Sequence, residues 1–75
     1  MKICKNKSSN LYFIYIQNTG NKETLFVTPR AQIVNLKTDL FWEIEEQEES
    51  YLLQSNILTK EQLQRLYAYK KDRSD

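Results

Sequence analysis

The sequence predicts a single small α+β domain covering residues 1–75, in which a three-stranded antiparallel β-meander is followed by two α-helices. Two observations predict this fold class. Before about residue 37 the apolar residues form short aromatic and β-branched runs, whereas after it they recur at helical spacing. Turn-forming residues separate three of these runs by gaps that are short enough for antiparallel hairpins.

The three strands follow from residue preference and turn signals. Residues 11–16 are aromatic and aliphatic, a composition that suits a pleated surface. The segment 18–21 contains the only glycine of the chain and predicts a hairpin turn. Residues 24–28 form the second strand, which Pro29 ends because proline cannot donate a backbone hydrogen bond to a neighbour. Residues 32–36 form the third.

Two helices are expected in the rest of the chain. Thr38 or Asp39 can cap the first helix through a side-chain oxygen, and this helix should end near residues 55–56. Its core-facing stripe comprises Leu40, Phe41, Ile44, Tyr51 and Leu52. Thr59 and Gln62 match a capping box and predict the start of the second helix. This helix carries Leu63, Leu66 and Tyr67 on one side.

The two ends of the chain, residues 1–9 and 72–75, are expected to be flexible because neither carries a clear structural signal. No apolar run reaches the roughly 20 residues that a membrane span needs. Cys4 is the only cysteine, so no internal disulfide can form, and a lone thiol suits a reducing compartment. We therefore expect a cytoplasmic protein that does not contact a membrane.

The charges of the chain are sorted into blocks. Residues 1–38 carry six bases and one acid, residues 39–59 carry six acids and no base, and residues 60–75 carry five bases and three acids. The formal net charge of +1 therefore hides a polarised surface. Such a surface selects the partners that approach it and repels others.

We expect no enzyme activity, cofactor or metal site. The sequence has no histidine for general acid–base work and too few glycines for a phosphate-binding loop. The acidic residues within 43–49 would point in many directions around a helix, whereas a bound cation needs converging oxygens. A solvated helix face is the simpler interpretation of this acidic run.

The first candidate binding surface is the strand at 11–16, because both of its faces are apolar. Its residues alternate, with Tyr12, Ile14 and Ile16 on one face and Leu11, Phe13 and Tyr15 on the other. An uncovered strand of this kind pairs readily with another chain, which predicts a dimer or partner interface on the first face. The alternative is that the helices cover one face and the tyrosines shield the other.

The second candidate is a stripe on the back of the first predicted helix. Its members follow i, i+4, i+7, i+11 spacing and are Trp42, Glu46, Glu49 and Leu53. Tryptophan is strongly enriched at binding hot spots, so the stripe predicts a partner contact. The alternative is that the second helix covers this side and makes the tryptophan part of the core.

These features favour a non-enzymatic protein-interaction or regulatory module of unknown pathway. A chain of this length buries a small core, so added burial in a homodimer would stabilise it. In such a dimer the basic first half of one subunit would face the acidic helix of the other.

The alternative function is single-stranded RNA or DNA binding through the basic, aromatic half of the sheet. Aromatic rings can stack on bases while lysines contact phosphates. The residues in this interpretation are Lys5, Lys7, Tyr12, Tyr15, Lys22, Arg65, Lys70 and Lys71. The acidic block opposes it, because six carboxylates would repel a polyanion.

Overall fold

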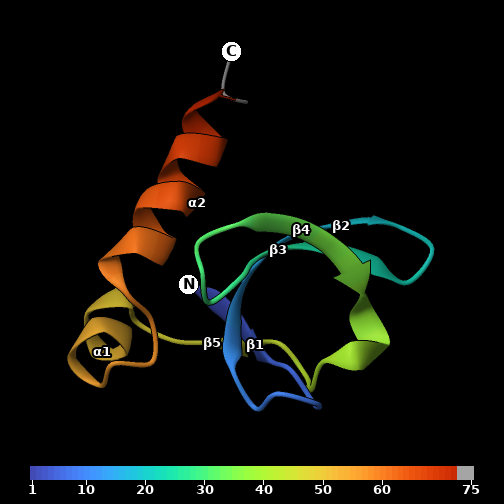
Figure 1. The fold of residues 1–75 in the computed structure, drawn as a ribbon, viewed down its shortest axis with the longest axis horizontal. Coiled ribbons are helices and arrows are strands. Elements are labelled where there is room, and N and C mark those ends of the chain that lie inside the picture. Colours follow the sequence, from blue (N-terminus) through green and yellow to red (C-terminus); the bar gives the residue numbers. More distant parts are fainter. Residues whose placement is uncertain (73–75) are drawn as a thin grey trace.

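The computed structural model describes residues 1–72, which form an antiparallel sheet with two α-helices on one side of it (Figure 1). The strands are β1 (Lys2–Lys5), β2 (Tyr12–Gly20), β3 (Glu23–Val27), β4 (Ile33–Lys37) and β5 (Glu45–Glu46). A 3-10 helix, η1, covers Thr38–Leu40, and the α-helices are α1 (Glu49–Gln54) and α2 (Lys60–Asp72). Neither α-helix in this part of the chain is long and apolar enough to cross a membrane.

The prediction of a small α+β domain with an antiparallel sheet and two helices is confirmed, but the three-strand count is wrong. The described sheet has five strands in the order β4-β3-β2-β1-β5. The three expected strands are β2, β3 and β4, and the two extra ones lie beyond β2. Ile3 of β1 pairs with Ile14 of β2 on one side and with Glu45 of β5 on the other.

The segment 1–9, which the sequence predicts to be flexible, contains β1 and the turn that follows it. A stretch of four apolar and basic residues is too short to predict a strand by itself. Its pairing with β2 and β5 stabilises it as a strand. Asn6 organises the turn, because its side-chain oxygen accepts hydrogen bonds from the backbone N–H groups of Ser8 and Ser9 at 3.0 and 2.9 Å. Of residues 72–75, which the sequence predicts to be flexible, Asp72 is the last residue of α2, and 73–75 lie outside the described residues.

The β3–β4 hairpin turns at Pro29, as predicted. The backbone N–H of Ala31 donates to the carbonyl of Thr28 at 2.9 Å, and Thr28 N–H donates to the carbonyl of Gln32 at 2.8 Å. Ala31 has φ of 60°, the left-handed conformation that a three-residue hairpin loop requires at its last position. The Thr28 hydroxyl accepts hydrogen bonds from the N–H groups of Arg30 and Gln32.

Both faces of β2 are covered, which confirms the alternative in which the helices bury one face. The first core cluster lies between the sheet and the helices and comprises Ile3, Ile14, Val27, Leu52, Leu58, Leu63 and Leu66. The second lies on the opposite face and comprises Cys4, Phe26 and Phe41, with Phe13, Tyr15, Val34 and Leu36 packed against it. The sheet curves over this second cluster (Figure 1), whose Phe26 and Phe41 rings have centroids 4.1 Å apart.

The prediction of a long first helix is wrong for most of its length. After η1 the chain continues in extended form beside β1 and does not become helical until Glu49. Three backbone hydrogen bonds hold this segment against β1. They run from Lys7 N–H to Leu40 O, from Trp42 N–H to Lys5 O and from Gln47 N–H to Met1 O, each at 2.9 Å.

Charge and burial explain why the segment is not helical. A helix would place Glu46 beside Glu43 and Glu49 at i,i+3 spacing, where like charges repel. The extended form instead sets Glu46 opposite Lys2 of β1 and buries Phe41 in the second cluster. The resulting α1 is short, and Asn56 ends it with φ of 60°.

The start of α2 confirms the predicted capping box. Gln62 N–H donates to the Thr59 hydroxyl at 3.2 Å, and Thr59 N–H donates to the Gln62 side-chain oxygen at 2.9 Å. Gln62 is 2% exposed, and its amide nitrogen also donates to the Thr28 carbonyl at 3.2 Å. This side chain therefore ties the first turn of α2 to the β3–β4 hairpin.

Candidate functional site: an acidic sheet edge and an adjoining groove

The surface with the most unusual composition is the outer edge of the sheet, formed by residues 39–46. This segment, which we call the acidic edge, begins in η1 and continues along β1, and within the described residues no further strand lies on the other side of β5. It combines acids with large apolar residues in the sequence Asp39-Leu40-Phe41-Trp42-Glu43-Ile44-Glu45-Glu46. Phe41 anchors the segment because its ring is 5% exposed in the second core cluster.

Three large apolar side chains of the acidic edge face solvent. Leu40, Trp42 and Ile44 are 45%, 48% and 44% exposed. The three side chains lie within five residues of one another, so their exposed apolar surface is concentrated in one short segment. Exposed apolar residues that are scattered singly over a surface create no such concentration. Concentrated apolar exposure of this kind marks interaction sites in folded proteins.

Trp42 is the outermost member of a row that crosses the sheet. The Lys5 ammonium of β1 lies 5.9 Å from the centroid of the Trp42 ring and 5.6 Å from that of Tyr12 of β2. Both contacts are cation–π interactions, which fix the orientation of the rings. The tryptophan is thus held in place while almost half of its surface stays exposed.

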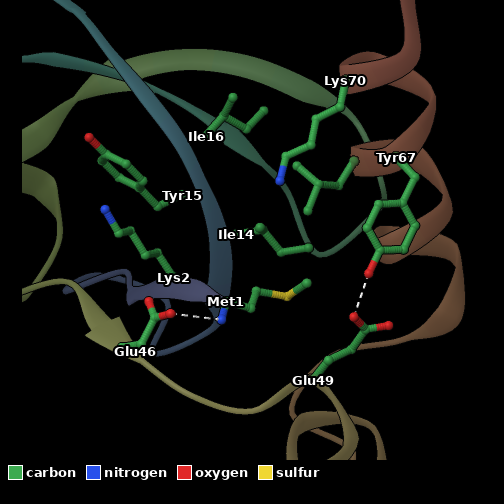
Figure 2. A pocket seen from close by; sticks show the side chains of 10 residues that line it. Met1, Lys2, Ile14, Tyr15, Ile16, Glu46, Glu49, Tyr67 and Lys70 are labelled. Carbon is green, nitrogen blue, oxygen red and sulfur yellow. Dashed lines mark hydrogen bonds and ion pairs between the residues drawn. The ribbon is translucent and has the colours of Figure 1, made fainter. Parts of the chain in front are cut away.

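A groove of about 390 Å³ adjoins the acidic edge, between the sheet and α2 (Figure 2). Its floor is apolar and includes Ile14, Ile16 and Leu66. Charged and phenolic side chains surround the floor: Lys2, Tyr15, Glu46, Glu49, Tyr67 and Lys70. Because Glu46 belongs both to β5 and to the groove, the two surfaces form one continuous region.

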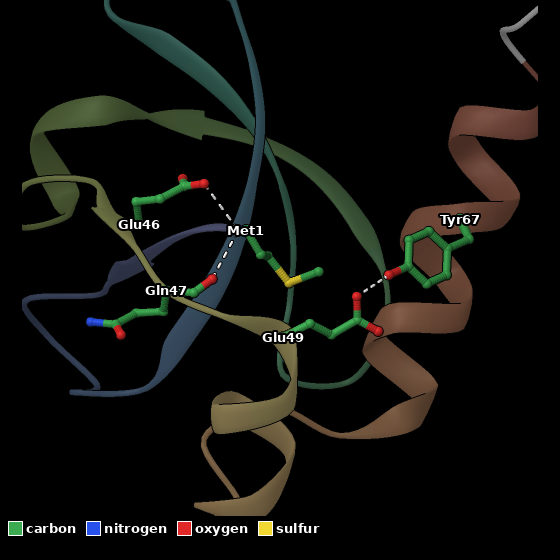
Figure 3. A network of polar contacts seen from close by, with 5 residues as sticks. All are labelled: Met1, Glu46, Gln47, Glu49 and Tyr67. Atoms are coloured by element: carbon green, nitrogen blue, oxygen red, sulfur yellow. Dashed lines mark hydrogen bonds and ion pairs between the residues drawn. The ribbon is translucent and has the colours of Figure 1, made fainter.

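A network of polar contacts shapes the side of this groove next to β5 (Figure 3). The amino group of Met1 donates to Glu46 Oε1 at 3.1 Å and to the Gln47 carbonyl at 2.8 Å. Across the groove, the Tyr67 hydroxyl donates a short hydrogen bond to Glu49 Oε2, and this bond raises the pKa of Tyr67. The second contact ties α2 to α1 at the surface.

The predicted interface residues do not form one surface. Ile14 is fully buried under the helices, while Tyr12 and Ile16 are half-buried at the border of the same cluster. The expected helical stripe does not exist, because two of its members lie in the extended segment. Of that stripe, Trp42, Glu46 and Glu49 are exposed and Leu53 packs on the core. The alternative that Trp42 belongs to the core is wrong.

The predicted nucleic-acid contacts are dispersed. Tyr12 lies on the helix-facing side of β2 with Lys5, whereas Tyr15 packs on the second cluster on the opposite face. Lys22 is at the far end of the β2–β3 hairpin and Lys7 follows β1. The remaining residues, Arg65, Lys70 and Lys71, belong to α2. The structure therefore gathers no platform of two stacked tyrosines.

The chemistry of single groups adds little to this region. Burial, assisted by the charge of Glu45, raises the pKa of the Cys4 thiol to about 11, so the thiol stays protonated at neutral pH. Among residues 1–72, no three side chains of the metal-binding types come together as a cation site.

Sequence reasoning missed Leu40 and Ile44 as surface residues, because it placed both in the core stripe of a helix. The missed signal is the strict alternation of acids and apolar residues over 42–45, which is typical of a strand. Comparison with known proteins gives no match to a family model, a curated protein or a solved structure.

Proposed function

We propose that this chain is a non-enzymatic protein-interaction module that binds its partner through the acidic edge. The observation that carries the proposal is the exposure of Leu40 at the end of η1 and of Trp42 and Ile44 in the extended segment that leads to β5 at the border of the sheet. Covering the exposed part of each side chain would contribute roughly 1 kcal/mol, about half of the value for full burial. Trp42 would serve as the anchor of the contact.

A purely protective role would explain only part of this surface. Natural proteins place charges on edge strands to prevent pairing between copies, and the acids of residues 43–46 fit that purpose. Protection gives no reason for large apolar side chains at the same positions, because these promote association. The combination of acids with exposed Trp42 and Ile44 therefore favours selective binding of a partner over simple protection of the edge.

The homodimer expected from the sequence stays a prediction, and the acidic edge constrains it. Pairing of two such edges would bring carboxylates beside carboxylates, which is destabilising for directly opposed residues. A symmetric dimer would therefore use a surface other than two opposed acidic edges.

Single-stranded nucleic-acid binding is the second candidate, and the Lys5 contacts with Tyr12 and Trp42 favour it. Rings and a cation in one row can contact bases and a phosphate. The carboxylates of Glu43 and Glu45 on the same edge oppose it by repelling phosphates.

Affinity capture from native lysate, with and without nuclease, tests both candidates. The baits are the wild type, Trp42→Ala and the matched control Tyr51→Ala, which removes a side chain of similar exposure, 51%, from α1. We expect to capture a protein whose binding persists after nuclease treatment, is lost with the Trp42→Ala bait and is retained with the Tyr51→Ala bait. Equal capture by all three baits would refute the proposed use of the acidic edge. Capture that disappears with nuclease would favour the nucleic-acid candidate.

A further inference from the structure

We propose that the partner docks as an extended segment rich in lysine or arginine, which adds a strand beside β5 along the acidic edge. This inference rests on the proposed function and specifies the chemistry of the partner. It follows from three properties of residues 39–46, namely their place in the sheet, their charge and their apolar side chains.

The place in the sheet determines the mode of binding. Hydrogen bonds from the backbone of Trp42 and Gln47 point to β1, so one side of the segment is already paired. Within residues 1–72 no strand pairs with the other side. An extended peptide can bind such an edge through main-chain hydrogen bonds, while its alternate side chains determine specificity.

The charge determines which peptides are accepted. Glu43 and Glu45 are exposed, and no ion pair within the described residues engages them. Lysine or arginine side chains of an added strand would lie next to these carboxylates, an arrangement that favours both association rate and register. A neutral or acidic strand would gain no such attraction.

The apolar residues determine the spacing within the peptide. Side chains of a strand alternate between its two faces, so a peptide with basic and apolar residues in alternation can satisfy both sets of contacts. Its apolar side chains would cover Trp42 and Ile44 while its cations meet the acids between them. The complementary peptide is therefore alternating, basic and extended.

Selection from a random-peptide display library on the immobilised protein tests this inference directly. Enriched peptides are synthesised and titrated against the protein, and binding is followed by the emission of Trp42, the only tryptophan of the chain. We expect enriched peptides with alternating basic and apolar residues and a blue shift of the emission on binding. Amides within residues 42–46 should become slower in hydrogen exchange as the new strand pairs with them.

Charge reversal provides the matched comparison. Glu43→Lys on the acidic edge and Glu61→Lys on α2 change the net charge equally, and both positions are exposed. We expect the dissociation constant to rise about ten-fold with Glu43→Lys and less than about two-fold with Glu61→Lys, because only the first charge lies beside the bound peptide. Added salt should weaken binding to the wild type.

Several results would overturn the inference. They are enrichment of neutral or acidic peptides, the absence of any enrichment, equal effects of the two charge reversals, and association of two copies through the acidic edge in place of peptide binding. If lysate capture still depends on Trp42 in any of these cases, the proposed function stands and the basic-strand inference alone fails. If capture is independent of Trp42, the proposed function fails as well.

Discussion

Replacing Ala31 by glycine should stabilise the protein, although it removes a methyl group. Ala31 occupies the last position of the β3–β4 turn with φ of 60°. In this left-handed conformation the Cβ atom lies too close to the backbone, which costs a residue other than glycine about 1–2 kcal/mol. Glycine avoids that cost, and the turn keeps its hydrogen bonds from the backbone of Ala31 and Thr28.

The expected gain in the free energy of unfolding is smaller than the conformational cost that glycine avoids. Glycine has more conformational freedom in the unfolded chain, and losing this freedom on folding offsets about 0.4–1 kcal/mol of the gain. The free energy of unfolding of Ala31→Gly should therefore rise by about 0.5–1 kcal/mol. For a domain of this size, each kcal/mol moves the melting temperature by about 4–8 °C.

The other alanine of the chain provides the control. Ala68 is exposed within α2, where glycine costs roughly 1 kcal/mol relative to alanine. Urea denaturation of the two variants should give midpoints on opposite sides of the wild-type midpoint. If Ala31→Gly lowers the midpoint as Ala68→Gly does, the left-handed turn is absent in solution and the reasoning is refuted.

Four further predictions concern the core, the thiol and the association state. Gln62→Leu should destabilise by about 1–3 kcal/mol in urea denaturation, because it removes the capping box and the side-chain amide that donates to the Thr28 carbonyl, which keeps only its hydrogen bond from Ala31 N–H; an unchanged midpoint would contradict this. Leu52→Ala should cost about 2–5 kcal/mol by the same assay, and a cost below about 1 kcal/mol would mean that α1 is not docked. The Cys4 thiol should make the stability of the fold depend on pH in the alkaline range. The folded state holds the thiol proton more tightly than the unfolded state, because burial raises the pKa of Cys4 from 9.0 to about 11. The contribution of this proton to stability is therefore complete below pH 9 and is lost as the pH rises toward 11. Parallel pH profiles of the unfolding free energy for the wild type and Cys4→Ala would disprove this. Sedimentation equilibrium at low salt should show the predicted homodimer, and a monomer at high concentration would reject it.

The sequence predicted correctly those elements whose structure depends on residues that are close together in the chain. The β3–β4 hairpin was predictable because Pro29 limits its own backbone and ends the strand before it. The start of α2 was predictable because Thr59 and Gln62 satisfy each other's backbone groups within one turn. In both cases the residues that determine the structure are neighbours in the sequence.

The alternation over 42–45 is a local strand signal, but the pairing of the sheet edge was not predictable because distant residues determine it. The spacing of Leu40, Phe41 and Ile44 fits a helix as well as an irregular strand, and only the pairing with β1 decides between them. That pairing joins residues 2 and 46, which no local pattern connects. The candidate site was therefore predicted in composition, through Trp42 and the acids, but in the wrong geometry.

The position of β1 between β2 and β5 has a consequence for the order in which the chain folds during synthesis. Lys5 pairs with Tyr12, which follows it closely, whereas Lys2 pairs with Glu46. A growing chain can form the four strands β1 to β4 early, because each pairs with its neighbour in the sequence. The sheet gains its last strand, and Phe41 closes the aromatic cluster, only after residue 46 has left the ribosome. A partner of the last strand would therefore meet only chains whose sheet is complete.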